Sequence, residues 1–369
     1  MVRSTDVFVI GGGPAGLAAA IAARQRGLRV IVADGMCPPI DKACGEGLMP
    51  DGLAAFERLG LQLPLTKCFP FQGIRFLSNN LTADALFPDR GVGLAARRPV
   101  LHRVMAERAL QVGAELLWGR PVTGITAEEV QAGTEFFRSQ WIIGADGSNS
   151  RVRRWAGLEA SHQPRLRYAF RRHYRLTPWT DHMEVHWGER CQGYATAVGE
   201  NEVCVVIASN DANLRFPAAL QELRWLSARL EGAEPTTAER GAVTGNKRLK
   251  RVWRGNMALI GDAAGTVDAI TGEGLGLAFS QAVALAECME AGDLSRYQQV
   301  HNRLMLRPML MARLMLLLDR RPRLQDRVLQ VFQRRPETFR RILALHIGAL
   351  PASDLVWDGL ALGWELLTV

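Results

Sequence analysis

Residues 7–34 decide the fold, through the stretch Val7-Phe8-Val9-Ile10-Gly11-Gly12-Gly13-Pro14-Ala15-Gly16 and the later run Leu28-Arg29-Val30-Ile31-Val32-Ala33-Asp34. The β-branched and aromatic residues at 7–10 and 28–32 predict two strands. The Ala-rich residues 17–26 between them are good helix formers. We therefore expect a strand, a glycine-rich turn, a helix and a second strand that ends at Asp34.

The turn has the spacing G-x-G-x-x-G and lies 23 positions before Asp34, which is the context of a dinucleotide-binding fingerprint. Gly11 permits the tight turn, Gly13 lets the backbone approach a pyrophosphate, and Gly16 lets the helix pack closely on the sheet. The helix N-terminus offers free N–H groups to the phosphates. Asp34 is placed to accept hydrogen bonds from both hydroxyls of an adenosine ribose. These residues alone do not show whether the bound nucleotide is NAD, NADP or FAD.

Two further strand-to-loop elements place an Asp directly after an apolar run. They are Trp141-Ile142-Ile143-Gly144-Ala145-Asp146-Gly147 and Met257-Ala258-Leu259-Ile260-Gly261-Asp262. A second glycine cluster, Thr271-Gly272-Glu273-Gly274-Leu275-Gly276-Leu277, opens an Ala-rich helix that extends to Glu290. In α/β sheets ligands bind at the carboxyl ends of the strands. A single Asp-Gly after a strand is more often an ordinary turn, but three such signals in one chain indicate more than ordinary turns.

The order of these motifs, with Arg98-Pro99-Val100-Leu101 between the first and second, resembles class A flavoproteins of the para-hydroxybenzoate hydroxylase fold over residues 5–290. That superfamily contains aromatic monooxygenases, geranylgeranyl reductases and flavin-dependent halogenases. The resemblance implies bound FAD and an α/β (α+β) fold. It implies a Rossmann-like FAD-binding domain with an inserted antiparallel-sheet substrate domain and a C-terminal helical segment.

The resemblance also assigns roles to residues of this sequence. The pyrophosphate would lie on Gly11, Gly13, Pro14, Ala15 and Gly16, and the adenosine would meet Asp34, Gly35 and the backbone of Val122. The remaining FAD contacts would come from Cys44, Gly45, Arg98, Asp146, Gly147, Gly261, Asp262, Gly272, Gly274, Leu275 and Gly276. The N–H groups of residues 274–276 would stabilise negative charge on reduced flavin. No metal site is expected.

We expect the FAD-binding domain to be discontinuous, formed by residues 1–72, 97–157 and 245–295. Residues 73–96 and 158–244 would form the substrate sheet, with a hairpin at Asn79-Asn80 and one helix over 215–231. Residues 296–369 would form a basic helical segment.

The loop Cys44-Gly45-Glu46-Gly47-Leu48 resembles the loop beside the flavin in geranylgeranyl reductases. Cys44 is a candidate redox or proton-donating residue, or a packing residue. Glu46 is a candidate general acid or, as we favour, a surface carboxylate. His173, His186 and Tyr194 are candidate substrate contacts that we expect more simply on the strand surface.

Other motifs argue against the reductase and the halogenase. The Tyr194–Gly199 stretch lacks the Trp and Pro of the Y-x-W-x-F-P strand that shapes the prenyl channel of the reductases. The halogenase lysine would fall at Phe71-Gln72, and its W-x-W-x-I-P motif is missing.

The comparison with aromatic hydroxylases is mixed. Gly265 and Ala269 stand where aromatic hydroxylases usually have His and Pro. An intact Asp146-Gly147 motif is compatible with reduction of the flavin by NADH or NADPH.

The sequence therefore predicts an NAD(P)H-dependent monooxygenase of an apolar aromatic or polyketide-like small molecule. A C=C reductase of the geranylgeranyl reductase type is the alternative. A flavin-dependent halogenase or a flavin-binding protein without turnover comes third.

Composition and charge limit the other classes of protein. With 48% apolar and 22% charged residues the chain is an ordinary globular protein. The six cysteines show no metal or disulfide spacing, and no apolar run is long enough to cross a membrane, so we expect a cytoplasmic location. The net charge of +8 comes from residues 296–344, where twelve Arg stand against three acidic residues. We expect amphipathic helices there that pack on the protein, or alternatively contact a membrane surface. Nucleic-acid binding is not expected. The oligomeric state is left open.

Overall fold

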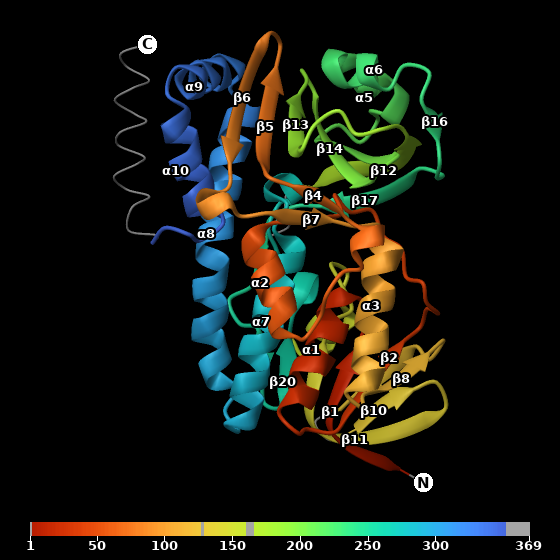
Figure 1. The fold of residues 1–369 in the computed structure, drawn as a ribbon. Helices are drawn as coiled ribbons and strands as arrows, with labels where there is room; N and C mark the ends of the chain where they lie inside the picture. The colour runs from red at the N-terminus through yellow and green to blue at the C-terminus, as the bar shows by residue number, and fades with distance from the viewer. Residues whose placement is uncertain (1, 127–128, 160–165, 352–369) are drawn as a thin grey trace.

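The computed structural model describes residues 2–126, 129–159 and 166–351. A mostly parallel sheet and a mostly antiparallel sheet lie one above the other, and the C-terminal helices run along the side of both (Figure 1). This arrangement places the glycine-rich turns near the junction of the two sheets.

The first sheet has the strand order β19-β20-β11-β1-β2-β8. Residues 7–10 of β1 are buried, because parallel strands covered on both faces need apolar side chains throughout. The hairpin β9–β10 is attached to β11. The strands are β1 (Arg3–Ile10), β2 (Val30–Asp34), β8 (Glu115–Trp118), β9 (Val122–Ile125), β10 (Glu129–Ala132), β11 (Glu135–Gly144), β19 (Trp253–Arg254) and β20 (Met257–Leu259).

The helices of this part pack around α1, which contacts both α3 and α7, while α2 packs against α7. The α1 helix is buried along nearly all its length, so its small alanines allow close helix contacts. The helices are α1 (Pro14–Gln25), α2 (Pro50–Arg58), α3 (Arg98–Gln111), α4 (Arg151–Trp155) and α7 (Gly274–Glu290).

The second sheet has the order β16-β12-β15-β14-β13-β5-β6, with β17 beside β12. The predicted hairpin at Asn79-Asn80 joins β5 and β6, and β13 pairs with β5 in parallel. Its strands are β5 (Gly73–Ser78), β6 (Leu81–Leu86), β12 (Arg167–Arg175), β13 (His182–Trp187), β14 (Cys191–Gly199), β15 (Glu202–Ser209), β16 (Glu234–Pro235) and β17 (Arg240–Thr244). Short strands complete the fold: β3 (Gly47–Leu48), β4 (Phe69–Phe71) and β7 (Gly93–Ala95) in one small sheet, and β18 (Lys247–Arg248) with β21 (Gly265–Thr266).

The prediction of a single helix over residues 215–231 is wrong in the number of helices. The segment forms two helices, α5 (Phe216–Glu222) and α6 (Arg224–Arg229), because Leu223 leaves the helical region with φ −99° and ψ 70°. Leu223 is buried against the sheet, and this packing outweighs the continuous helical pattern of the sequence.

The basic C-terminal segment forms the helices α8 (Ser295–Asp319), α9 (Pro322–Arg334) and α10 (Pro336–His346). The α8 helix packs on α7, whereas α9 and α10 pack on β6 of the second sheet. The chain leaves the helical conformation at Arg321 and Arg335, and Pro322 and Pro336 then begin α9 and α10, where a missing N–H donor is tolerated. Within the described ranges, no helix is both long and apolar enough to cross a membrane. The predicted segment beyond residue 351 lies outside the described residues.

Candidate functional site

The turn between β1 and α1 forms one wall of a cavity. Gly11 has φ +111°, and a side chain on it would overlap the carbonyl oxygen of Ala145. A side chain on Gly16 would overlap the carbonyl oxygen of Gly11. At Gly13 the space is open, and Pro14 begins α1. The turn therefore presents the N-terminus of α1 to an open cavity, as an anion-binding turn requires.

The cavity continues along the ends of β2 and β9. Asp34, the last residue of β2, accepts hydrogen bonds from the N–H of Gly12 (2.7 Å) and of Met36 (2.8 Å). These bonds fix its carboxylate at the wall of the cavity. Lys42 and Arg151 bring positive charge to the same wall, which suits an anionic ligand. Other lining residues include Gly35, Val122 and Trp155.

Asp146 lies in the cavity wall, but its carboxylate serves the protein backbone. It accepts hydrogen bonds from the N–H of Arg151 (2.6 Å) and Val152 (3.2 Å) and from the Ser150 hydroxyl. These bonds satisfy the free N–H groups at the start of α4. Gly147 follows with φ +82°, which favours glycine. In this structure Asp146 and Gly147 thus shape the loop that borders the cavity.

Arg153 connects the two Asp loops, a role that the sequence did not indicate. Its side chain is buried, and its guanidinium donates to the carbonyl oxygens of Ala263 (3.0 Å) and Ser148 (2.8 Å). One residue therefore holds the Asp146 loop and the Asp262 loop together. A buried guanidinium with two backbone acceptors is visible only once the loops are folded.

Three positively charged side chains, those of Lys42, Arg98 and Arg153, influence the carboxyl of Asp262. Burial raises the pKa of its carboxyl, and the charges of Lys42, Arg98 and Arg153 oppose that rise. Arg98 begins α3, and its Nε atom is buried without a partner among the described residues. Gly261 holds the Asp262 loop in place, since its N–H donates to Gln281 Oε1 (2.8 Å) and it packs closely on Ala15.

The last glycine cluster forms the start of α7. Gly272 has φ +68°, and side chains added at Gly272 or Gly274 would meet nothing within 4 Å. The free N–H groups at the start of this 17-residue helix therefore border open space. Leu275 is half-buried. Gly276 instead allows α7 to pack closely on α2, because a Cβ on it would lie 2.8 Å from the Cα of Gly52 in α2.

The expectation that Glu46 is a surface carboxylate is wrong. Its side chain is fully buried and accepts hydrogen bonds from the N–H of Arg98 (2.8 Å) and from Arg171 Nη1 (3.0 Å). Its other oxygen lies 2.7 Å from Nε2 of His173. Cys44 lies beside this cluster, where its sulfur accepts from the N–H of Glu46 (3.3 Å). Gly45, between them, has open space around it.

We expected His173, His186 and Tyr194 on the strand surface, but their side chains are also buried. His173 contacts Glu46, and His186 Nε2 lies 3.0 Å from Glu184 Oε2. Tyr194 donates to Gln192 Oε1 (2.9 Å). The sheet is covered by other elements on both faces, so alternation along a strand does not mark a solvent face here.

Glu46, His173 and Cys204 are close enough together to share a metal ion. The Arg171 guanidinium already bonds to Glu46 there, and it also bonds to Asp41 (2.9 Å). A positive charge in direct contact with Glu46 disfavours a cation. We therefore interpret these residues as a buried ion cluster that fixes the residue 41–46 loop to β12.

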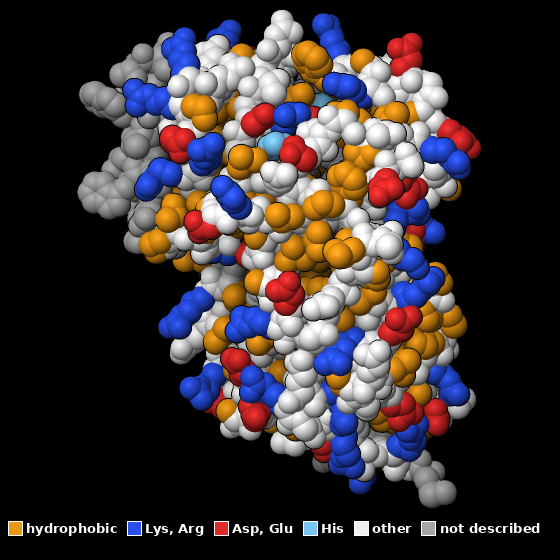
Figure 2. All heavy atoms as spheres, viewed as in Figure 1, with side chains coloured by type: hydrophobic (Ala, Val, Ile, Leu, Met, Phe, Trp, Pro, Cys, Tyr) orange, Lys and Arg blue, Asp and Glu red, His pale blue; other side chains and the backbone are white. Residues whose placement is uncertain are grey.

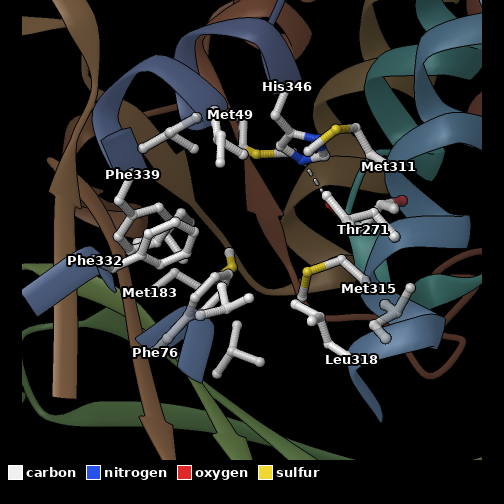
Figure 3. Close-up of a pocket in the computed structure, with 18 of the residues that line it drawn as sticks. Met49, Phe76, Met183, Thr271, Met311, Met315, Leu318, Phe332, Phe339 and His346 are labelled. Carbon is white, nitrogen blue, oxygen red and sulfur yellow. Dashed lines mark hydrogen bonds between the residues drawn. The ribbon is translucent and has the colours of Figure 1, made fainter. Parts of the chain in front are cut away.

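An apolar pocket, partly open to solvent, lies between the second sheet and the C-terminal helices. Its walls are mostly methionine, leucine and phenylalanine side chains, and it reaches Thr271 and Gly272, just before α7 (Figure 3). The sequence did not reveal it, because its walls come from several segments that are far apart in the chain. The lining residues labelled in Figure 3 are Met49, Phe76, Met183, Thr271, Met311, Met315, Leu318, Phe332, Phe339 and His346.

These features fit FAD. The open cradles at Gly13, Gly272 and Gly274 leave room for a ligand along the site. The buried, unpartnered Nε of Arg98 and the positive charges around Asp262 suit a bound pyrophosphate or ribityl chain. Asp34 at the end of β2 suits the ribose.

The family model described as "FAD binding domain" matches residues 4–291. The chain therefore belongs to this family, and it is an FAD-dependent oxidoreductase. This agrees with the class that the sequence predicted.

The chain is similar in sequence to curated proteins. The chain is 29% identical to a menaquinone reductase of Mycolicibacterium smegmatis over 332 residues, covering 80% of this chain and 79% of that protein. It is also 29% identical to digeranylgeranylglycerophospholipid reductase 1 of Methanothermobacter thermautotrophicus over 299 residues, covering 74% of each. Among solved structures, the flavin-dependent brominase Bmp2 has a similar fold, with a TM-score of 0.80, 17% identity and 94% of each chain covered. The last likeness supports the fold.

Proposed function

We propose that this protein is an FAD-dependent reductase that saturates carbon–carbon double bonds in the isoprenoid chain of a lipid. The observation that carries the proposal is the apolar pocket, which ends at Thr271 and Gly272 beside the start of α7. Methionine side chains are flexible and suit an apolar chain with many conformations. The names of the two curated relatives, which describe reductases of such lipids, support the same substrate class.

The missing Trp and Pro of the prenyl-channel strand do not remove the pocket. Tyr194 of that strand lines it, but most of its walls come from β5, β13 and the helices α8–α10. A motif in one strand therefore says little about a cavity formed by several elements. This is why we place the reductase before the monooxygenase, in reverse of the order that the sequence favoured.

The residues of the site would divide the work as follows. The start of α1, with Asp34, would bind the adenosine diphosphate half of FAD, and Arg98 with Asp262 would bind its central part. The start of α7 would bind the flavin ring. Bound reduced FAD supplies hydride. The apolar walls would exclude water and hold the double bond in position.

Hydroxylation of an apolar aromatic molecule is the second candidate. The same pocket favours it in one respect, since its apolar walls would also help to exclude water from oxygen chemistry at a flavin. NADH or NADPH as the electron donor belongs to the proposal for either reaction.

The test uses the FAD-loaded protein with dithionite as reductant and geranylgeranyl or menaquinone lipids, followed by mass spectrometry. Without oxygen, we expect a mass gain of two hydrogen atoms for each reduced double bond. A product that forms only with oxygen and NAD(P)H, and that gains an oxygen atom, would replace the reductase with the monooxygenase.

A pocket variant links the activity to this cavity. Met315→Trp on α8 would fill the pocket with an indole, so we expect reduction to fall at least about tenfold while FAD content is unchanged. Leu317→Trp is the matched control, because Leu317 lies two residues further along α8 and is 46% exposed. Equal activity of the two variants would contradict this placement of the substrate.

A further inference from the structure

Four titratable side chains from four different segments meet beside the apolar pocket. Asp51 comes from α2, Glu273 directly precedes α7, Arg307 comes from α8, and His346 ends α10. Arg307 Nη2 lies 3.7 Å from Asp51 Oδ2, and His346 Nδ1 lies 3.7 Å from Glu273 Oε2. The side chains of Glu273 and His346 are only 5% and 12% exposed. None of the four has a role in holding FAD in the account above.

The contacts of His346 determine where its proton lies. Its Nε2 is 3.2 Å from the carbonyl oxygen of Thr271, an atom that can only accept, so Nε2 carries hydrogen (Figure 3). In the neutral ring, Nδ1 is then an acceptor. It faces Glu273 Oε2, and both atoms are buried without a hydrogen-bond partner among the described residues. A proton on the Glu273 carboxyl would satisfy both atoms with a small approach.

The charges around the pair favour this protonation state. Burial, together with the negative charge of Asp51, raises the pKa of Glu273 to about 8, and Arg307 opposes that rise. Burial lowers the pKa of His346 to about 4 against the pull of Asp51. Burial also raises the pKa of Asp51, opposed by His346 and Arg307. Near neutral pH the pair is therefore a protonated carboxyl beside a neutral imidazole.

The position of His346 connects this pair to the pocket. His346 lines the cavity at the same end as Thr271 and Gly272. Among the described residues that line it, Tyr194 is the other titratable side chain, and its hydroxyl donates to Gln192. Burial raises the pKa of Tyr194 far above neutrality, so it releases a proton less readily than the pair does.

We propose that Glu273 holds a proton and that His346 delivers it to the substrate in the pocket. This inference rests on the proposed reduction. Saturating a double bond adds one hydride and one proton to its two carbons, and reduced flavin supplies the hydride. The second carbon takes the Nε2 proton of His346, while Nδ1 takes the Glu273 proton. Glu273 is left as a carboxylate. The Nδ1 proton then returns to Glu273 and Nε2 takes a proton from water, so that the ring returns to its first tautomer. His346 is the catalytic residue in this step, and Glu273 acts through it.

The first test compares Glu273→Gln with Glu337→Gln in single-turnover reduction of a geranylgeranyl lipid. Glutamine keeps the size of the side chain but cannot transfer a proton, so we expect a loss of at least about 100-fold, with unchanged FAD content and lipid binding. Glu337 is the matched control because it is exposed on α10, the helix of His346. In the wild type the rate should fall as pH rises above about 8, the pKa of Glu273. The slow reaction of Glu273→Gln should not show this fall.

The second test does not depend on activity. Infrared spectra of the FAD-loaded protein should contain a protonated carboxyl band at neutral pH that Glu273→Gln removes and Glu337→Gln retains. Absence of that band would overturn the inference. Full activity of Glu273→Gln would also overturn it, as would a loss of activity in Tyr194→Phe that Glu273→Gln does not show. A wild type that has the band but reduces no prenyl lipid would overturn the proposed function, and with it the role of the proton, while the protonated pair would stand.

Discussion

At the scale of single residues, the burial of Glu273 should make stability depend on pH. Its pKa rises from 4.5 to about 8 on folding, so the folded state binds more protons than the unfolded state between these values. Stability must then fall as pH rises through this range. His346 has the opposite sign, because its pKa falls from 6.5 to about 4, but its contribution is complete above about pH 6.5.

Between about pH 6.5 and 8, therefore, Glu273 dominates within this pair. We expect the free energy of unfolding to fall there by on the order of 1–2 kcal/mol in the wild type, and this fall to be absent in Glu273→Gln. Urea denaturation at several pH values measures it. Identical pH dependence of the two proteins would show that Glu273 is ionised in the folded state.

Individual residues also mark the limit of what the sequence could predict. The positions of Gly11, Gly13 and Asp34 follow from a local spacing, and the structure places them around one cavity. The interior position of Glu46 was out of reach, because its partner His173 is 127 residues away. From the sequence alone, a carboxylate in a glycine-rich loop is expected at the surface. Its burial depends on Arg171 and His173, which the second sheet places next to it.

At the scale of elements, the contact between α2 and α7 should control how well the flavin site is held. In Gly276→Ala, a gain of about 1 kcal/mol in helix propensity opposes an overpacking cost of about 1–3 kcal/mol against the backbone of Gly52. We expect a net loss of up to about 2 kcal/mol and weaker FAD binding, because the start of α7 must shift. Denaturation and FAD titration measure the two effects.

Gly241→Ala in β17 is the control for this prediction. An added Cβ there would meet its neighbours at ordinary distances of 3.8–4.0 Å, so stability should change by less than about 0.5 kcal/mol. Unchanged stability and FAD affinity in Gly276→Ala would mean that α2 and α7 can separate freely.

The elements themselves could be predicted largely from the sequence. The strands β1, β2 and β13 and the β5–β6 hairpin follow from local alternation, apolar runs and turn residues. The break between α5 and α6 could not, because it depends on Leu223 packing against the sheet. The pocket was hidden for the same reason, since α8–α10 complete walls that begin in β5 and β13.

At the scale of the whole molecule, most arginines of α8–α10 are exposed, with Arg307 as an exception, while many apolar side chains of these helices pack on the protein. Figure 2 shows several Lys and Arg side chains over the region of α9 and α10. This agrees with the packed, outward-facing arrangement that we favoured, and it leaves a basic surface beside the pocket. We propose that this surface contacts anionic lipid headgroups, which would give an apolar substrate a short path to the pocket.

This proposal predicts stronger co-sedimentation with vesicles that contain phosphatidylglycerol than with phosphatidylcholine vesicles, and weaker binding at high salt. Changing the exposed Arg320, Arg321 and Arg323 to Gln should reduce binding by up to about 1 kcal/mol for each charge. The matched control is the Gln variant of Arg29, Arg138 and Arg175, which are exposed elsewhere. Equal loss in both triple variants would indicate a general charge effect.

The central claim is that reduced flavin in this protein passes its electrons to an isoprenoid double bond. The most direct measurement is stopped-flow absorbance: the FAD-loaded protein is reduced, oxygen is removed, and a geranylgeranyl lipid is added. We expect the absorbance of oxidised flavin to return, with one double bond saturated for each flavin. If the flavin stays reduced until oxygen is admitted, the claim is contradicted, and oxygen is the electron acceptor.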